Sequence, residues 1–179
     1  MSKDWMMTFT GRHVFPLDVK QEDIDLKDIA HSLSMQCRYN GHTANFYSVA
    51  EHAYLISRAL ERDGHDRITC LTGLLHDASE TYVGDIIRPL KNSLKNSTKE
   101  AELKIEQAVS ERFGLPWPWH DAVDEYDKRI IVDEKDSPLL FGPHKPWNWE
   151  MEALSVTINC WAPHVARSYF MDRYEYLTK

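Results

Sequence analysis

The 179-residue sequence predicts a single all-α domain built as a helical bundle. Apolar residues recur at steps of three and four residues in several stretches, which is the spacing of an amphipathic helix. Residues that commonly cap helices stand just before several of these stretches. The length is sufficient for one domain with a sizeable core. We expect the core over about residues 26–136, followed by a loop and a helix over residues 137–179.

The composition limits which partners the protein can bind. The formal net charge of -7 argues against binding to a long nucleic-acid backbone. Three scattered cysteines, an odd number, indicate reduced thiols and a cytoplasmic setting. No apolar run is long enough for a membrane span, and the N-terminus lacks a long apolar run. We therefore expect neither a membrane segment nor a signal peptide.

A short hairpin and a first helix are predicted at the start of the chain. Residues 7–16 can form a β-hairpin that turns at Gly11. Asp25 is placed to cap a helix whose apolar residues keep the helical period, namely Leu26, Ile29, Ala30 and Leu33. Turn-forming residues over 38–43 end this helix.

The second predicted helix carries a histidine on its inner side. Ser48 and Glu51 form a capping-box pattern, in which each side chain satisfies a backbone amide at the helix start. The helix that they open extends to about residue 62. His52 lies on the same side as the apolar Ile56, so it points toward the core.

The third predicted helix is capped by Asp66 and continues through Tyr82. It carries three polar residues beside its apolar face: His76, Asp77 and Glu80. Buried polar groups are costly unless they are paired or bind a metal. A polar helix edge with a local hydrogen bond between the histidine and the glutamate is the alternative interpretation.

The dipeptide His-Asp occurs three times, and its position decides which copy matters. Asp66 and Asp121 fall at predicted helix starts, where Asp is a preferred cap. Only the pair His76-Asp77 lies inside a predicted helix with an apolar face. We therefore select this pair as the candidate for chemistry.

Two further helices follow an irregular connection. The connection over residues 86–97 carries three basic residues: Arg88, Lys91 and Lys95. Ser97 and Glu100 form a second capping box, which opens a helix that ends at Gly114. A fifth helix is predicted from Asp121 to about residue 136.

Asp127 places a carboxylate among the apolar residues of the fifth helix. Its sequence neighbours Lys128 and Arg129 do not face it on a helix, so a local ion pair does not account for it. Glu134 lies two turns further on, on nearly the same side.

A loop over residues 137–149 and a last helix over residues 163–177 complete the predicted fold. The loop is predicted to expose three large aromatic residues: Phe141, Trp147 and Trp149. Exposed aromatic residues often mark contacts between proteins, so we expect a homo-oligomer. Folding of these rings back onto their own domain is an equally good interpretation.

Two histidines and two aspartates on three of these helices suggest a metal site. His52, His76, Asp77 and Asp127 meet if the helices converge, as helices in a bundle readily do. Two imidazoles and two carboxylates suit one divalent transition ion, such as Co, Mn, Zn, Ni or Fe. Four protein ligands on an octahedral ion leave one position for water and one for a phosphate oxygen.

The residues around this set suggest phosphate chemistry. Glu80 is one turn from the proposed ligands, where it can protonate a leaving alkoxide, and Asp85 can orient the attacking water. Arg38 and Lys91 are candidates for binding phosphate, Arg38 through its planar guanidinium.

An ordered set of motifs resembles the HD-domain metal-dependent phosphohydrolases. The motifs span about residues 26–136, and the string from His76 to Glu80 is the specific part. In chain order they are Ser48-Val-Ala-Glu51-His52, His76-Asp77-Ala78-Ser79-Glu80, Gly84-Asp85, Pro89-Leu90-Lys91 and Asp127. Within this family the sequence is most similar to the 5′-deoxynucleotidases and the phage-type dATP triphosphohydrolases.

The resemblance implies both a site and a reaction. It implies one divalent metal on His52, His76, Asp77 and Asp127, and cleavage of the ester oxygen at the 5′ carbon. It also implies that Glu80 and Asp85 take part in catalysis. Arg38 and Lys91 are implied to bind phosphate. In the 5′-deoxynucleotidases a Trp follows the phosphate-binding Arg and crowds a ribose 2′-hydroxyl, whereas Tyr39 stands at this position here.

We expect a phosphohydrolase of deoxynucleotides. The exact substrate and other classes of protein stay open as alternatives. A triphosphate such as dATP is favoured because Arg88, Lys91 and Lys95 can hold further phosphates. A 5′-deoxynucleotidase acting on dNMP is the close alternative. A non-enzymatic helical module with a structural metal belongs to another class, and structural sites are usually closed by protein ligands. A cyclic-dinucleotide hydrolase is less favoured, since there are too few further His and Asp positions for two metals.

Overall fold

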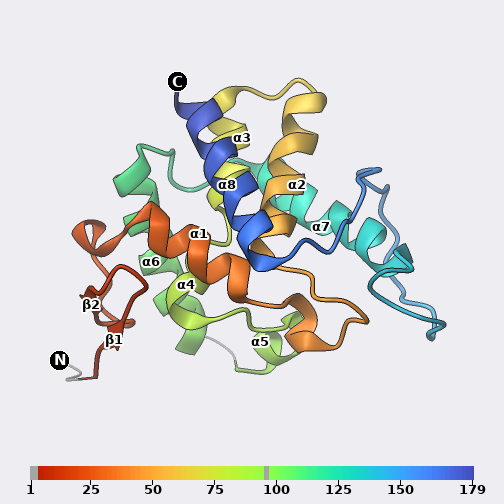
Figure 1. Cartoon of the computed structure of the whole chain (residues 1–179), viewed down its shortest axis with the longest axis horizontal. Helices are drawn as coiled ribbons and strands as arrows, with labels where there is room; N and C mark the ends of the chain where they lie inside the picture. Colours follow the sequence, from red (N-terminus) through yellow and green to blue (C-terminus); the bar gives the residue numbers. More distant parts are fainter. Residues whose placement is uncertain (1–3, 95–96) are drawn as a thin grey trace.

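Helix α2 (Val49–Arg62) lies at the centre of the molecule. The computed structural model describes residues 4–94 and 97–179, without the side chains of residues 97 and 98. Helix α2 contacts helices of the N-terminal half, the middle and the C-terminus of the chain (Figure 1). The other elements are β1 (Met6–Met7), β2 (His13–Val14), η1 (Gln21–Asp23), α1 (Leu26–Met35), η2 (Arg38–Gly41), α3 (Arg67–Leu75), α4 (Glu80–Val83), α5 (Arg88–Leu94), α6 (Ser97–Phe113), α7 (Asp121–Asp136) and α8 (Pro163–Thr178).

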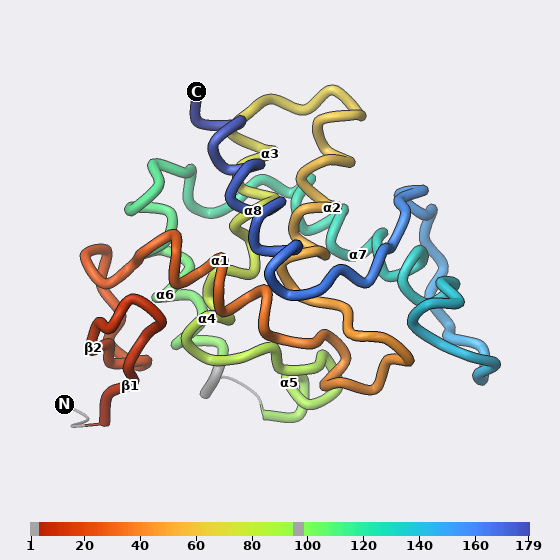
Figure 2. Tube along the Cα trace, viewed as in Figure 1, coloured from red at the N-terminus to blue at the C-terminus, as the bar shows by residue number. Residues whose placement is uncertain are grey.

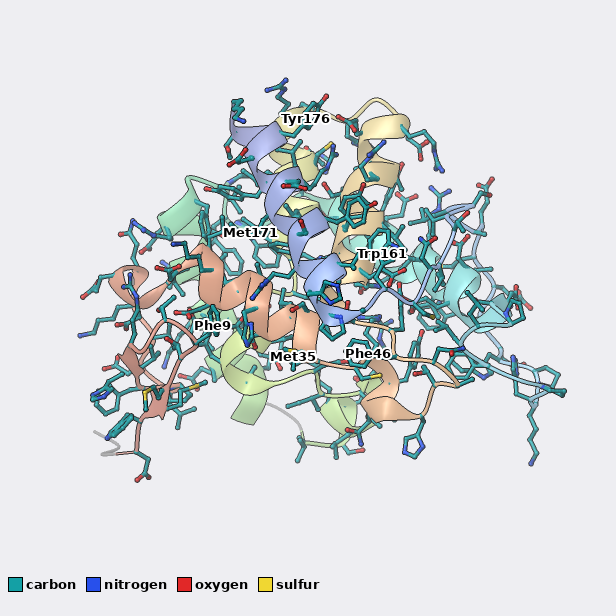
Figure 3. All side chains as sticks on the ribbon, in the orientation of Figure 1. Phe9, Met35, Phe46, Trp161, Met171 and Tyr176 are labelled. Atoms are coloured by element: carbon teal, nitrogen blue, oxygen red, sulfur yellow. The ribbon has the colours of Figure 1, made fainter. Side chains whose placement is uncertain are left out.

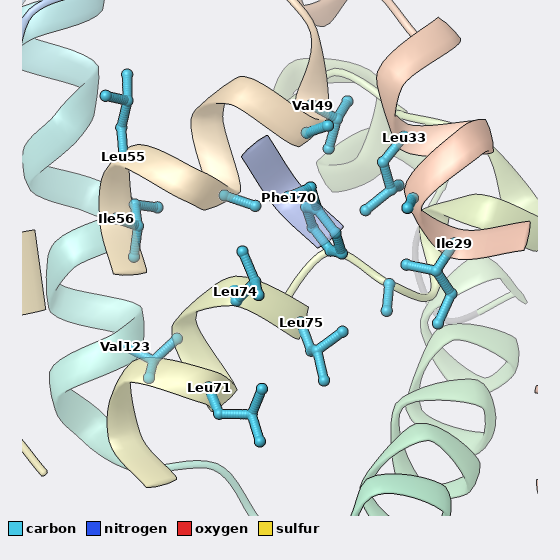
Figure 4. Close-up of a cluster of buried hydrophobic side chains, with 14 of the residues drawn as sticks. Ile29, Leu33, Val49, Leu55, Ile56, Leu71, Leu74, Leu75, Val123 and Phe170 are labelled. Carbon is cyan, nitrogen blue, oxygen red and sulfur yellow. The ribbon is translucent and has the colours of Figure 1, made fainter. Parts of the chain in front are cut away.

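The apolar core forms where α1, α2, α3, α7 and α8 meet. Figure 4 shows Phe170 of α8 among apolar side chains of α1, α2 and α3. An added Cβ at Gly73 of α3 would lie 2.5 Å from Leu60 Cδ1 and 3.3 Å from Ile56 Cγ2. The absence of a side chain at Gly73 therefore allows α2 and α3 to approach closely.

Most of the predicted elements are confirmed. The hairpin pairs Met6 with Val14 and Met7 with His13. The carboxylate of Asp25 caps α1 by accepting a hydrogen bond of 2.9 Å from the backbone N–H of Lys27. The fold is mostly helical and forms one domain, as expected.

The prediction of one continuous helix from Asp66 to Tyr82 is wrong. Helix α3 ends at Leu75, and a tighter turn with bonds such as Glu80 N–H to Asp77 O leads into α4. The ring nitrogen Nδ1 of His76 lies 2.9 Å from the carbonyl oxygen of Gly73. In a regular helix this carbonyl would accept from the amide of Asp77, so the histidine side chain competes with the helical hydrogen bond.

The prediction of an irregular connection over residues 86–97 is also wrong, because α5 forms there. Pro89 is the second residue of this helix, and Pro is tolerated in a first turn, where its missing N–H has no helical partner. The predicted cap at Ser97 and the predicted role of Lys95 lie outside the described residues. At the start of α7 the cap is His120, whose Nδ1 accepts from the amide of Ala122, rather than Asp121.

The capping box at the start of α2 is correct only in its first half. The hydroxyl of Ser48 accepts from the amide of Glu51 at 3.1 Å. The fully buried carboxylate of Glu51 does not return to Ser48 but accepts three backbone amides of a distant segment. These are Asn159 at 2.7 Å, Cys160 at 3.1 Å and Trp161 at 2.7 Å. Buried amides outside regular structure need acceptors, and Glu51 supplies them.

These bonds fix the long segment between α7 and α8 to the central helix. Figure 2 shows this segment running beyond the end of α7 and returning to the start of α8. Trp161 lies near the start of α8, beside α2 (Figure 3), and contacts Tyr54 edge-on with ring centroids 5.3 Å apart. Among the described helices, none has the length and apolar character needed to cross a membrane.

Replacing Glu51 with Gln should destabilise the protein by about 1–3 kcal/mol, because an amide N–H₂ would face backbone donors that lose their acceptor. Denaturant titration measures the change in the free energy of unfolding. The same substitution at the exposed Glu175, whose carboxylate pairs with the exposed Lys179, is the control and should be nearly neutral. Equal stability of both variants would contradict the anchoring role of Glu51.

Candidate metal centre

Three residues from α2, the end of α3 and α7 form a group that can hold a metal ion. They are His52, His76 and Asp127, each offering one ligand atom, and these atoms all lie within 4.8 Å of one another. His52 is fully buried and His76 nearly so. The groups come together because α2 packs against both α3 and α7.

Asp77 lies beside this group. Its carboxylate oxygens lie 3.2 Å from His76 Nε2 and 3.6 Å from His52 Nε2. Asp127 Oδ1 lies 3.2 Å from His52 Nε2 and 3.8 Å from His76 Nε2. An ion that binds nitrogen at about 2.1 Å keeps neighbouring ligand atoms roughly 3 Å apart, so these separations need little adjustment.

The hydrogen bonds of the two histidines prepare their Nε2 atoms as ligands. Nδ1 of His76 faces a carbonyl oxygen, which only accepts, and Nδ1 of His52 lies 2.7 Å from a carboxylate oxygen of Glu134. In the neutral rings the proton is therefore on Nδ1 and the lone pair on Nε2. Both Nε2 atoms are buried without a hydrogen-bond partner among the described residues. The lone pairs of these two nitrogens and the oxygens of the nearby carboxylates are all electron donors, so the arrangement suits a bound cation.

The carboxylates of Asp77 and Asp127 concentrate negative charge at the centre, and this charge shifts the pKa values of the residues there. Burial lowers the pKa of His76, but the carboxylates of Asp77 and Asp127 outweigh it and hold this pKa well above the ordinary value. Burial raises the pKa of Asp77, but the charge of His76 outweighs it and lowers this pKa to about 2. Burial also raises the pKa of Asp127, but hydrogen bonds with His52 and His76 outweigh it and hold this pKa well below the ordinary value. Both carboxylates are therefore ionised at neutral pH, as metal ligands must be.

Glu134 is the residue that sequence reasoning noticed without assigning a role. It is fully buried, accepts a hydrogen bond from Tyr39 Oη and lies 3.3 Å from Arg38 Nε, in addition to its bond with His52. Burial raises its pKa, but the charge of Arg38 outweighs it and lowers the pKa to about 2. A histidine ligand needs a partner for its other ring nitrogen. Glu134 lies seven residues, or about two helical turns, after the proposed ligand Asp127 on α7, and this spacing is the sequence signal that could have identified it.

Eight of the ten predicted site residues line one cavity of about 760 Å³, whereas the buried His52 and His76 do not line it. A cavity of this size suits a small-molecule ligand. The eight residues are Arg38, Tyr39, Asp77, Glu80, Asp85, Arg88, Lys91 and Asp127.

The two predicted catalytic carboxylates lie in this cavity. One carboxylate oxygen of Glu80 is buried without a hydrogen-bond partner among the described residues, and burial, with the charges of Asp77 and Asp85, raises its pKa well above the ordinary value. Burial also raises the pKa of Asp85. The side chain of Gln36 links them, because it donates to Glu80 O at 3.1 Å and accepts from Asp85 N–H at 2.9 Å.

The predicted phosphate-binding residues all have acidic neighbours. The half-exposed Arg88 contacts Asp127 at 3.3 Å, and Lys91 contacts Glu102 at 2.8 Å. Arg38 lies 3.6 Å from Asp77 in addition to its contact with Glu134. Tyr39 adopts a left-handed backbone with a φ of 57°, which is uncommon for a residue other than glycine, and thereby places its ring at the cavity wall.

The expectation that the loop over residues 137–149 exposes its aromatic rings is only partly correct. Phe141 and Trp149 are half-buried, Trp147 is 37% exposed, and all three line the same cavity. The rings therefore fold back over the site. Self-association of the chain stays a prediction.

Comparison with known proteins places the chain in a family. It is 34% identical over 180 aligned residues to the uncharacterized protein YfdR of Escherichia coli K12, covering 98% of this chain and 96% of that protein. It is 38% identical over 120 residues to the uncharacterized protein RCAP_rcc00048 of Rhodobacter capsulatus, covering 65% of this chain and 61% of that protein. No model of a protein family matches the chain. The chain belongs to the same family as YfdR.

Replacing His52, His76, Asp77 or Asp127 with Ala should abolish tight binding of Mn²⁺ or Co²⁺, measured by calorimetric titration of the metal-free protein. Replacing Glu134 with Gln should weaken binding about 10- to 100-fold, because an outer partner orients its ligand without touching the ion.

The control for these variants is His13→Gln, at an exposed position of strand β2, which should bind metal as the wild type does. Unchanged affinity in Asp127→Ala would contradict the assignment of this residue as a ligand.

Proposed function

We propose that this protein is an HD-domain metal-dependent phosphohydrolase that cleaves the 5′ phosphoester of deoxynucleotides. The favoured substrate is a dNTP such as dATP, which would give deoxynucleoside and triphosphate. One observation carries the proposal: the cavity is lined by Asp127 of the candidate metal group, by Glu80, by cationic side chains and by aromatic rings, and one carboxylate oxygen of Glu80 is buried with no hydrogen-bond partner among the described residues. A ligand with phosphates at one end and a planar ring at the other matches this combination.

His52, His76, Asp77 and Asp127 would hold one divalent transition ion, namely Co, Mn, Zn, Ni or Fe. When bound, such an ion supplies Lewis-acid polarisation of a phosphoryl group and makes water more acidic. Glu134 keeps the ring of His52 in the required tautomer through its contact with Nδ1.

Glu80 is the proposed general acid. Burial and the negative charges of Asp77 and Asp85 raise its pKa, which favours the protonated carboxyl group that a general acid needs at the departing 5′ oxygen. Asp85 lies on the same wall of the cavity and can accept a hydrogen bond from the attacking water. The Gln36 side chain holds the backbones of these two residues at a fixed spacing.

Arg38, Lys91 and Arg88 would hold the phosphates. Arg38 lies 3.6 Å from the proposed ligand Asp77, and its guanidinium can stabilise charge on the phosphorus under attack. Lys91 and Arg88 lie on α5 at the cavity wall, where further phosphates of a dNTP can extend. Each cation has an acidic neighbour, so the cationic side chains are held in position before the substrate binds.

Incubation of the Mn- or Co-loaded protein with dATP should yield deoxyadenosine and intact triphosphate, separated by chromatography. With dAMP, if it is accepted, the products should be deoxyadenosine and phosphate. Release of orthophosphate and dADP from dATP would mean cleavage at the far end of the chain. Absence of turnover across a panel of deoxy- and ribonucleotides, despite bound metal, would instead indicate a non-enzymatic module.

Replacing Glu80 with Gln should lower the rate by roughly 10²–10⁴-fold while metal content and substrate binding are kept, because the amide cannot deliver a proton. Glu106→Gln is a matched control, since this carboxyl is also partly buried, with a pKa that burial and Glu102 raise to about 7, but it does not line the cavity. Loss of metal together with activity in Glu80→Gln would make Glu80 a ligand rather than an acid.

A further inference from the structure

Four aromatic residues form one wall of the cavity. This aromatic wall consists of Tyr39 from η2 and of Phe141, Trp147 and Trp149 from the segment after α7. The ring centroids of Phe141 lie 5.1 Å from Tyr39 and 5.3 Å from Trp147, and Tyr39 lies 5.9 Å from Trp147. The wall and the proposed metal ligands Asp77 and Asp127 line the same space.

The rings of Tyr39, Phe141 and Trp147 are not stacked in parallel on one another. The angles between the planes of Tyr39, Phe141 and Trp147 are 84°, 58° and 57°, so the rings meet edge-on or tilted. Elsewhere in the described chain the aromatic pairs include parallel stacks, such as Trp161 on Tyr169 with centroids 4.4 Å apart and planes at 21°. A stacked pair covers two faces, whereas tilted rings leave faces available to a flat ligand.

The wall is held in place before any ligand binds. The carbonyl oxygen of Leu140 accepts from the amide of Ala44 at 2.8 Å, and that of Leu139 accepts from the side chain of Asn45 at 2.8 Å. The indole N–H of Trp149 donates to the carbonyl oxygen of Lys128 at 2.9 Å. These bonds tie the loop to the segment after η2 and to α7, which lowers the entropy cost of binding.

One cation connects the wall to the metal centre. The guanidinium of Arg88 lies 5.2 Å from the ring centroid of Trp149 and 3.3 Å from the carboxylate of Asp127. A ligand that spans from the wall to the proposed metal ligands therefore passes a positive charge.

We propose that the aromatic wall binds the nucleobase of the substrate by stacking, with Trp147 as the principal contact and purines bound more tightly than pyrimidines. Trp147 and Trp149 offer the two-ring systems of the wall, and Trp147 is the more exposed of the two, at 37%. Stacking strengthens with ring area, which favours the two-ring bases. The identity of the base as part of a nucleotide rests on the proposed function, but the binding of a purine ring does not require hydrolysis.

The test uses the full chain treated with a chelator and titrated with deoxyadenosine, which lacks phosphate and needs no metal. Calorimetry measures its dissociation constant for wild type, Trp147→Ala and Trp117→Ala. Trp117 is the matched control, since it is also 37% exposed, contacts Trp119 and does not line the cavity. Loss of one stacking contact should weaken binding about tenfold in Trp147→Ala, with no change in Trp117→Ala. Trp147→Phe, which keeps a ring face, should recover part of the loss.

A second measurement locates the ligand without a mutation. The indole N–H signal of Trp147 in the nuclear magnetic resonance spectrum should shift on addition of deoxyadenosine, and that of Trp117 should not. Tripolyphosphate should bind equally well to the Mn-loaded wild type and Trp147→Ala, since the wall does not touch phosphate.

The outcomes separate this proposal from the proposed function. Equal affinity of wild type and Trp147→Ala for deoxyadenosine, or no binding by the wild type, would overturn the base site even if dATP is hydrolysed. Loss of deoxyadenosine binding in Trp147→Ala would support the base site even if no nucleotide is hydrolysed, in which case only the proposed function fails.

Discussion

The contact between His52 Nδ1 and Glu134 is the interaction on which the site depends. It joins the central helix α2 to α7 in the interior of the protein, and both residues are fully buried. Two buried polar groups of this kind are stable only when each satisfies the other. Because Glu134 fixes the proton on Nδ1, the Nε2 atom turns its lone pair toward Asp77 and Asp127. Glu134 also contacts Arg38 and Tyr39, so one carboxylate organises the floor and one wall of the cavity.

The surroundings of the carboxylates in the site shift their pKa values in opposite directions. Asp77 has His76 beside it, and its pKa falls to about 2 despite burial. Glu80 is buried next to the negative charges of Asp77 and Asp85, and its pKa rises. Groups of the same chemistry thus have pKa values shifted in opposite directions a few residues apart, which is the arrangement that acid–base chemistry beside a cation requires.

The tight turn between α3 and α4 contributes to this separation. It replaces a regular helix over His76–Ser79 and places the side chains of His76, Asp77 and Glu80 at positions that a continuous helix would not give them. The close packing of α2 on Gly73 and the contact of its carbonyl with the His76 ring set where this turn occurs. The core and the site therefore share the same few residues of α3.

The sequence by itself determined the local structure of this protein. Helical periodicity and the caps at Asp25, Ser48 and Asp66 depend on residues close together in the chain, and these predictions hold except for the continuation of the third helix beyond Leu75. The same local reasoning selected His76-Asp77 from three His-Asp pairs. It failed at α5, where Pro89 suggested a loop although Pro fits a first helical turn.

Only the tertiary structure decided which polar residues meet. The partners His52 and Glu134 are separated by 82 positions, and Glu51 binds amides 108 to 110 positions away. The spacing of residues along one helix gives the face on which a side chain lies, but not the helix that this face will contact. The buried roles of Glu51 and Glu134, and the position of Phe141, Trp147 and Trp149 over the cavity, follow from packing between distant segments. Hydrogen bonds and ring contacts across such distances leave no periodic signal in the sequence.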